Sequence, residues 1–209
     1  GAFRNPTPGA PNNGPQGEFL LEKVVFSHES QVITGELQLE LRSSLPEATI
    51  RYTTDATSPN RSWRTYNGPI PVSRTTRVTA RLEQAGKEPG PLRDRTFVLL
   101  DDSMRNVRSN LPLIIVDSFG RRIDNESSAN SQNPLRPVHG IFIDVDPVTG
   151  VARPTDLPDF EGRGGMRVRG QTSSGFPKKQ YSFETWDSEG NDKDVSIFGY
   201  PAESDWIIH

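Results

Sequence analysis

The sequence predicts a mainly β protein that opens with an antiparallel β-sandwich and continues into a second β-rich unit. Three observations lead to this fold class. Short alternating runs of apolar and polar residues recur through residues 19–100 at intervals of roughly 8 to 16 residues, with turn-forming residues between them. No segment of that stretch has helical periodicity. Glycine (18) and proline (18) make up about 17% of the 209 residues, against roughly 12% in average proteins, which favours many short elements joined by turns.

The strands of the first unit follow from alternation. Residues 37–41 alternate strictly between leucine and a polar residue, which places the three leucines on one buried face. Residues 49–53 alternate as well, with Ile50 and Tyr52 pointing inward. Further strands are expected at 70–72, 75–82 and 95–100. Turns are expected at 54–60 and 67–69, which contain Asp, Asn, Pro and Gly.

The second unit has a different strand pattern. Residues 111–116 are apolar on both faces and predict a central strand, and residues 139–146 predict another buried strand. Residues 122–137 are rich in Ser, Asn and Pro, which predicts a surface loop. Residues 195–199 are the segment that favours a turn of helix. Later strands are expected at 164–170, 178–186 and 204–209.

The same patterns predict the domain organisation. Residues 1–18 are rich in Pro, Gly and Asn and predict a linker, and residues 19–100 form the sandwich. The charged stretch 101–109 is expected to connect it to the second unit at 110–209. The chain begins without methionine and stops inside the apolar run 206–208, so we expect a piece of a longer protein.

Composition excludes several classes of function. A net charge of −3 and a pI of about 5.7 argue against a general nucleic-acid binder, which needs a basic excess. The absence of cysteine excludes disulfides and Cys-ligated metal centres. His28, His139 and His209 do not pair at metal-ligand spacing, so no metal site is expected. No apolar run approaches the roughly 20 residues that span a bilayer, so we expect no membrane span.

Acidic residues gather in two places. Residues 187–194 hold several carboxylates around a glycine but lack the EF-hand spacing, and therefore predict a polar hairpin tip. Asp144 and Asp146 would share one strand face, which could suit acid–base chemistry. With no partner identified, we interpret them as solvating the end of a strand. The tryptophans are expected to pack in the cores or at their rims: Trp63, Trp186 and Trp206.

Positive charge concentrates in residues 167–181, which carry four basic side chains and no acidic one. These side chains are Arg167, Arg169, Lys178 and Lys179. The arginines, two residues apart on a strand, project to one face. Between the basic pairs, Gly170 gives backbone freedom, and the stretch 172–174 supplies hydroxyl and N–H groups. Such a loop can wrap a phosphate-like anion, although it is not a Walker A motif. The alternative is an ordinary solvated β-turn.

The first unit resembles the chitobiase/β-hexosaminidase C-terminal-type domain over residues 19–100. The resemblance is carried by residues 26–28, 48–55, 66–70 and 75–80. Ala56 follows Asp55 where the family normally has glycine. The resemblance implies a small immunoglobulin-like sandwich that accompanies secreted enzymes in an accessory or spacing role and supplies no catalytic residue.

The second unit resembles the N-terminal part of the spore coat protein CotH kinase family over residues 110–209. Matching blocks lie at 111–117, 169–181 and 197–206, with departures at Gln171 and Thr172. The resemblance implies the β-rich N-terminal lobe of an atypical kinase-like fold, which binds ATP with Mg²⁺ or Mn²⁺ and phosphorylates protein serine. On this analogy the loop over the phosphates contains Arg169, Gly170, Ser173 and Ser174. Lys178 or Lys179 would steady the phosphate oxygens.

Taken together, these resemblances predict a fragment of a secreted or surface bacterial kinase, with the catalytic Asp and the metal ligands beyond His209. We therefore expect no catalytic or metal-binding residue in this chain, no turnover by it alone and no tight binding of ATP. The expected partners are the C-terminal lobe of the same protein and a protein serine substrate, with no nucleic acid. The alternative is a non-enzymatic extracellular structural or adhesive module, in contact with carbohydrate through the sandwich.

Overall fold

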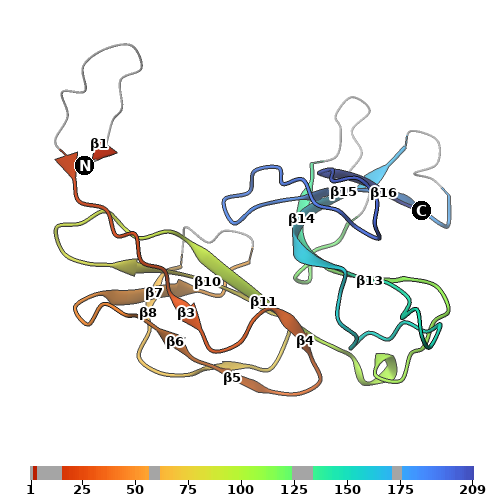
Figure 1. The fold of residues 1–209 in the computed structure, drawn as a ribbon, viewed down its shortest axis with the longest axis horizontal. Helices are drawn as coiled ribbons and strands as arrows, with labels where there is room; N and C mark the ends of the chain where they lie inside the picture. The colour runs from red at the N-terminus through yellow and green to blue at the C-terminus, as the bar shows by residue number, and fades with distance from the viewer. Residues whose placement is uncertain (1, 4–15, 57–61, 124–133, 171–175) are drawn as a thin grey trace, which may run out of the picture. The chain divides into compact units, whose positions relative to one another are not determined.

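The computed structural model describes residues 2–3, 16–56, 62–123, 134–170 and 176–209, and it confirms the mainly β composition (Figure 1). The strands up to residue 99 are β1 (Ala2–Phe3), β2 (Gln16–Gly17), β3 (Val25–Phe26), β4 (Gln31–Ile33), β5 (Leu37–Leu39), β6 (Leu41–Arg42), β7 (Thr49–Thr53), β8 (Arg64–Thr65), β9 (Ile70–Val72), β10 (Thr76–Glu83) and β11 (Arg93–Leu99). The later elements are the 3₁₀ helix η1 (Asp102–Met104) and strands β12 (Leu113–Asp117), β13 (Arg136–Ile143), β14 (Phe160–Arg169), β15 (Gln180–Thr185) and β16 (Asp205–Ile208).

The chain divides into two compact units, which share strand β11 at the boundary. The first consists of Gly1–Glu29, Leu37–Val72 and Arg77–Arg95, and the second of Ser30–Glu36, Ser73–Thr76 and Thr96–His209. The second unit therefore includes β4 and the last residues of β11, besides the strands of the predicted second domain.

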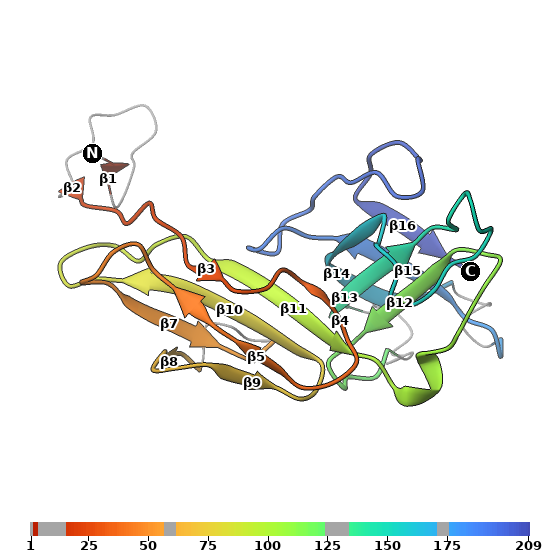
Figure 2. The ribbon, with the colours of Figure 1, turned by 60° about the horizontal axis from the view of Figure 1, so that its bottom comes forward.

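Strands β11, β10, β7 and β8 lie side by side in that order, as both ribbon views show (Figures 1 and 2). Ile50 and Tyr52 of β7 lie opposite Leu82 and Ala80 of β10, on the apolar side of the sheet as predicted, and both are half-buried. Leu82 and Ala80 are completely buried, as is Val78. Removing such side chains from water is the main stabilising contribution, about 1.5–3 kcal/mol for each large apolar one.

The opposite face of this sheet is polar. Arg77 is 2% exposed, and its Nε donates to Oδ2 of Asp94 at 3.1 Å. A buried arginine of this kind needs its carboxylate, because an unpaired charge would be costly to remove from water. Farther along, the guanidinium of Arg81 lies 4.5 Å from the ring centre of half-buried Trp63. Trp63 therefore stacks with an arginine on the polar face, and its expected packing in a core or at a core rim stays a prediction.

The single strand predicted at 37–41 is interrupted at Glu40. β5 pairs with β9, whereas β6 pairs with β3. Both backbone groups of Glu40 bind Ser27: its N–H donates to the hydroxyl oxygen, and its carbonyl accepts the Ser27 N–H, each at 2.9 Å. The alternation of the leucines continues through the break, and Leu39 and Leu41 are buried as predicted.

The second unit is built on the antiparallel sheet β12–β13–β14–β15–β16 (Figure 2). One face, here called the aromatic face, buries the following side chains: Val138, Phe142, Met166, Phe183 and Ile197. Ile197 comes from the segment at 195–199, for which a turn of helix was predicted. That prediction is wrong, because Val195 instead forms an antiparallel bridge with Glu203.

The other face of the sheet, here called the outer face, is apolar at one side and polar at the other. Ile141 and Ile143 of β13 pack there with Ala152 and with Val98 of β11. Beyond them, β14 and β15 present arginine, serine and glutamine on this face. The predicted connector 101–109 contains the short helix η1, for which Asp101 is the N-cap residue.

Two glycines of β14 allow large side chains to approach its backbone. A Cβ at Gly164 would lie 2.4 Å from the carbonyl oxygen of Glu184 and 3.0 Å from the Phe183 ring. A Cβ at Gly165 would lie 2.3 Å from Cζ2 of Trp186. The close packing of β14 against β15, which positions the candidate site, therefore depends on these glycines.

Candidate functional site

The basic segment forms the β14–β15 hairpin, and its register assigns each side chain to a face. Arg169 pairs with Gln180 and Arg167 with Ser182, while the intervening pair is Val168 with Tyr181. Directly opposed residues of antiparallel strands point to the same side of the sheet. Val168 is buried on the aromatic face, so both arginines project from the outer face.

The structure places the cations of this hairpin in different environments. Arg169, Gly170 and Lys178 are exposed, whereas Arg167 and Lys179 are half-buried. Both half-buried cations interact with other groups of the chain. Ser173 and Ser174, predicted for the same loop, lie outside the described residues.

Gly170 directly follows the last residue of β14 and has a φ of 91°. This value lies in the left-handed region, which glycine enters without the steric cost of a Cβ. The predicted backbone freedom at this position is therefore used, directly after the arginine pair.

A cluster around Trp186 supports the other end of the hairpin. The Trp186 Nε1 donates to Oε1 of Glu184 at 2.6 Å, and the Arg163 guanidinium lies 5.7 Å from the indole ring. Burial raises the pKa of Glu184, and the negative charges of Asp192 and Asp205 raise it further. The outer face thus has cations near the loop and carboxylates at the far end of the same strands.

The acidic stretch at 187–194 forms the predicted polar hairpin tip. Oδ1 of Asp187 accepts the N–H groups of Glu189, Gly190 and Asn191 at 2.8–2.9 Å. These bonds, that of Asn191 above all, lower the pKa of Asp187. Within the described ranges, no group of three or more His, Cys, Asp or Glu side chains could hold a metal ion.

Asp144 and Asp146 do not share a strand face, because β13 ends at Ile143. Oδ1 of Asp146 accepts the N–H groups of Val148 and Thr149 at 2.9 and 2.7 Å, and these bonds lower its pKa. Oδ1 of Asp144 accepts the N–H of Val145 at 2.7 Å, directly after the strand. These bonds agree with a role in solvating the strand end rather than in acid–base chemistry.

A buried pair in β13 and β14 has no counterpart in the sequence predictions. Nε2 of His139 lies 2.9 Å from Oε1 of Glu161, and the two side chains are 4% and 14% exposed. Hydrogen bonding satisfies both groups inside the sheet. A histidine within the apolar run 139–146 was the one signal for such a pair.

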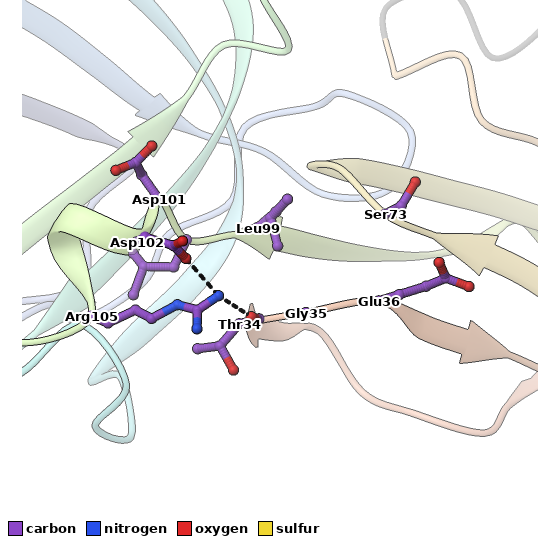
Figure 3. A pocket seen from close by; sticks show the side chains of 9 residues that line it. Thr34, Gly35, Glu36, Ser73, Leu99, Asp101, Asp102 and Arg105 are labelled. Atoms are coloured by element: carbon purple, nitrogen blue, oxygen red, sulfur yellow. Dashed lines mark hydrogen bonds and ion pairs between the residues drawn. The ribbon is translucent and has the colours of Figure 1, made fainter.

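The second unit also contains an open cavity of about 370 Å³, shown in Figure 3. Its lining consists of Thr34, Gly35, Glu36, Ser73, Leu99, Leu100, Asp101, Asp102 and Arg105. The Arg105 guanidinium donates to the carbonyl oxygen of Thr34 and pairs with Asp102 at 2.7 Å. None of the described residues predicted for the anion site lines it, and its carboxylates disfavour an anionic ligand.

Comparison with known proteins supports the first of the two resemblances. Residues 29–92 match the family model of the chitobiase/beta-hexosaminidase C-terminal domain. The match lies within the predicted 19–100 stretch and covers β4 to β10. In the comparisons with curated proteins and with solved structures, nothing matched the chain significantly. None of these comparisons supports the similarity to CotH, which stays a prediction.

In the part of the chain that the structure describes, no helix has the length and apolarity to cross a membrane.

Proposed function

We propose that the β14–β15 hairpin binds a phosphate-like oxyanion, as the nucleotide-binding lobe of a secreted or surface CotH-like protein kinase. In this proposal the first unit is an accessory β-sandwich, the phosphoacceptor is a protein serine, and the catalytic groups belong to another part of the parent protein. The chain alone contributes phosphate contacts and no catalytic residue.

The observation that carries the proposal is the pair of exposed cations, Arg169 and Lys178, at the two ends of one loop. Arg169 is the last residue of β14, and Lys178 lies two residues before β15 begins. A guanidinium offers a planar fork of donors, and an ammonium adds a mobile point charge. These donors suit the oxygens of a phosphate group.

The donor set fits a phosphate group better than a metal ion. Arginine and lysine supply positive charge and N–H donors, which phosphate oxygens accept. Mg²⁺ and Mn²⁺ require oxygen ligands, and the described residues hold no suitable acidic cluster. We therefore assign the phosphate contacts of ATP to this hairpin, and assign the metal ligands to none of the described residues.

A second candidate function is a non-enzymatic extracellular module with a spacing or adhesive role. The observation that favours it is the match of residues 29–92 to the chitobiase/beta-hexosaminidase C-terminal domain. Under this alternative the hairpin cations are solvated and bind no specific ligand.

Isothermal titration of the chain with ATP, and separately with adenosine, tests the proposed function. ATP should bind weakly, and its affinity should fall as salt is raised, because phosphate contacts are screened by ions. Adenosine should not bind at the same concentrations. The triple variant R169A/K178A/K179A should lose ATP binding.

The variant R74A/K23A/K193A is a matched control, because it also removes one arginine and two lysines, all exposed and outside the hairpin. It should keep the affinity of the wild-type chain. Equal loss of affinity in both triple variants would show non-specific attraction of the anion, and no binding by the wild-type chain would refute the proposed function.

A further inference from the structure

The hairpin contains four cations, and their positions divide them into two pairs with different roles. We propose that Arg169 and Lys178 contact the oxyanion, whereas Arg167 and Lys179 hold the hairpin in place. This assignment rests on the proposed function and decides between the two lysines that the sequence left open.

Strand alternation separates the lysines. In β15, Phe183 is completely buried on the aromatic face, and Tyr181 lies on the same side. Lys179 has the same parity as Tyr181, whereas Lys178 has the parity of Gln180, which lies directly opposite Arg169. Lys179 directly precedes β15, so the alternation directs it toward the covered face. Lys178 lies in a bend before the strand and is not held to that face.

Burial agrees with this separation. Lys179 is half-buried and interacts within the chain, whereas Lys178 is exposed. A lysine that already interacts within the chain would have to give up that interaction to reach a ligand. Lys178 is already exposed to solvent and can reach a ligand without leaving a buried position.

The arginines differ in the same way. Arg167 is half-buried, lies opposite Ser182 in the body of the sheet and interacts within the chain. Arg169 is exposed at the end of β14, next to the turn at Gly170. One arginine and one lysine therefore remain exposed, the first at the end of β14 and the second two residues before β15, and these are the cations that an anion can reach.

Titration of single variants with inorganic triphosphate tests the assignment. The variants are R169A, K178A, R167A, K179A and the exposed control K193A, and each removes one positive charge. R169A and K178A should each weaken binding about tenfold, the effect of losing one hydrogen bond to a charged group. K193A should bind as the wild-type chain does, and R167A and K179A should weaken binding by less than about threefold.

Melting temperatures supply the second readout. R167A and K179A should lower the melting temperature of the chain, since each removes an existing interaction, whereas R169A and K178A should leave it unchanged. If R167A or K179A prevents folding, R167Q or K179Q replaces it, because glutamine keeps hydrogen-bonding capacity without the charge.

The outcomes separate the two proposals. If the wild-type chain binds triphosphate and K179A weakens binding more than K178A, the assignment of the lysines is wrong while the proposed function stands. Equal weakening by all five variants would also overturn the assignment, since it would show a general effect of charge. If the wild-type chain does not bind triphosphate at all, the proposed function fails and the assignment fails with it.

Discussion

Replacing Gly164 by alanine should destabilise the second unit strongly, because the added Cβ meets backbone. That Cβ would lie 2.4 Å from the carbonyl oxygen of Glu184, about 1.0 Å short of ordinary contact at 3.4 Å. Side-chain motion cannot relieve this contact. Strands β14 and β15 would have to separate, and the hydrogen bonds of their ladder would lengthen beyond their usual 2.9–3.0 Å.

We expect Gly164→Ala to cost about 3 kcal/mol of unfolding free energy, the upper end of the usual range for overpacking. Urea unfolding followed by tryptophan fluorescence measures it, since Trp186 and Trp206 belong to this unit. Gly35→Ala is the matched control in the same unit, because a Cβ there meets nothing within 4 Å. The control should be neutral or stabilised by less than about 1 kcal/mol, through the smaller entropy of its unfolded chain. If the Gly164 variant unfolds at the same urea concentration as the control, the register of β14 against β15 is wrong.

Three further predictions concern single side chains. Glu184→Gln should stabilise the protein at neutral pH. Because the pKa of Glu184 is raised in the folded protein, its contribution to stability is complete at acidic pH and is lost as the pH rises above the ordinary glutamate value. The difference in melting temperature between the wild-type chain and the variant should therefore grow from pH 4 to pH 7. A difference that stays constant over this range would contradict this prediction. Arg77→Ala should lower the free energy of unfolding in urea by about 3 kcal/mol, because it leaves Asp94 without its buried partner. The control Arg42→Ala breaks an exposed ion pair and should cost less than about 1 kcal/mol. Similar costs for the two variants would be inconsistent with the burial of Arg77. Gly170→Ala should lower the free energy of unfolding by about 1 kcal/mol, since the φ of 91° at this position strains any residue with a Cβ. An unchanged melting temperature would argue against this backbone conformation at Gly170.

The sequence was sufficient to predict much of the fold because local alternation reports burial directly. The alternation at 49–53 places Ile50 and Tyr52 opposite the buried side chains of β10. The break at Glu40 could not be predicted in this way. It depends on hydrogen bonds to Ser27, thirteen positions earlier in the chain, and the leucine pattern does not change where the pairing partner changes.

The candidate site shows the same limit. Alternation separated Lys178 from Lys179, but the buried side of β15 is determined by what packs on it. Part of that packing is Ile197, which comes from a segment after the strand. The His139–Glu161 pair was missed because two adjacent strands bring together residues that are 22 positions apart. Recognising it required the β13–β14 register in addition to the residue types.

Mapping the binding of inorganic triphosphate by amide chemical shifts is the most direct measurement of whether the hairpin holds an oxyanion. We expect the largest saturable shifts at Gly170, Phe176 and residues 178–180, with smaller shifts along the outer face of β14. Shifts centred on the cavity around Arg105, or no saturable shift in the hairpin, would contradict the account.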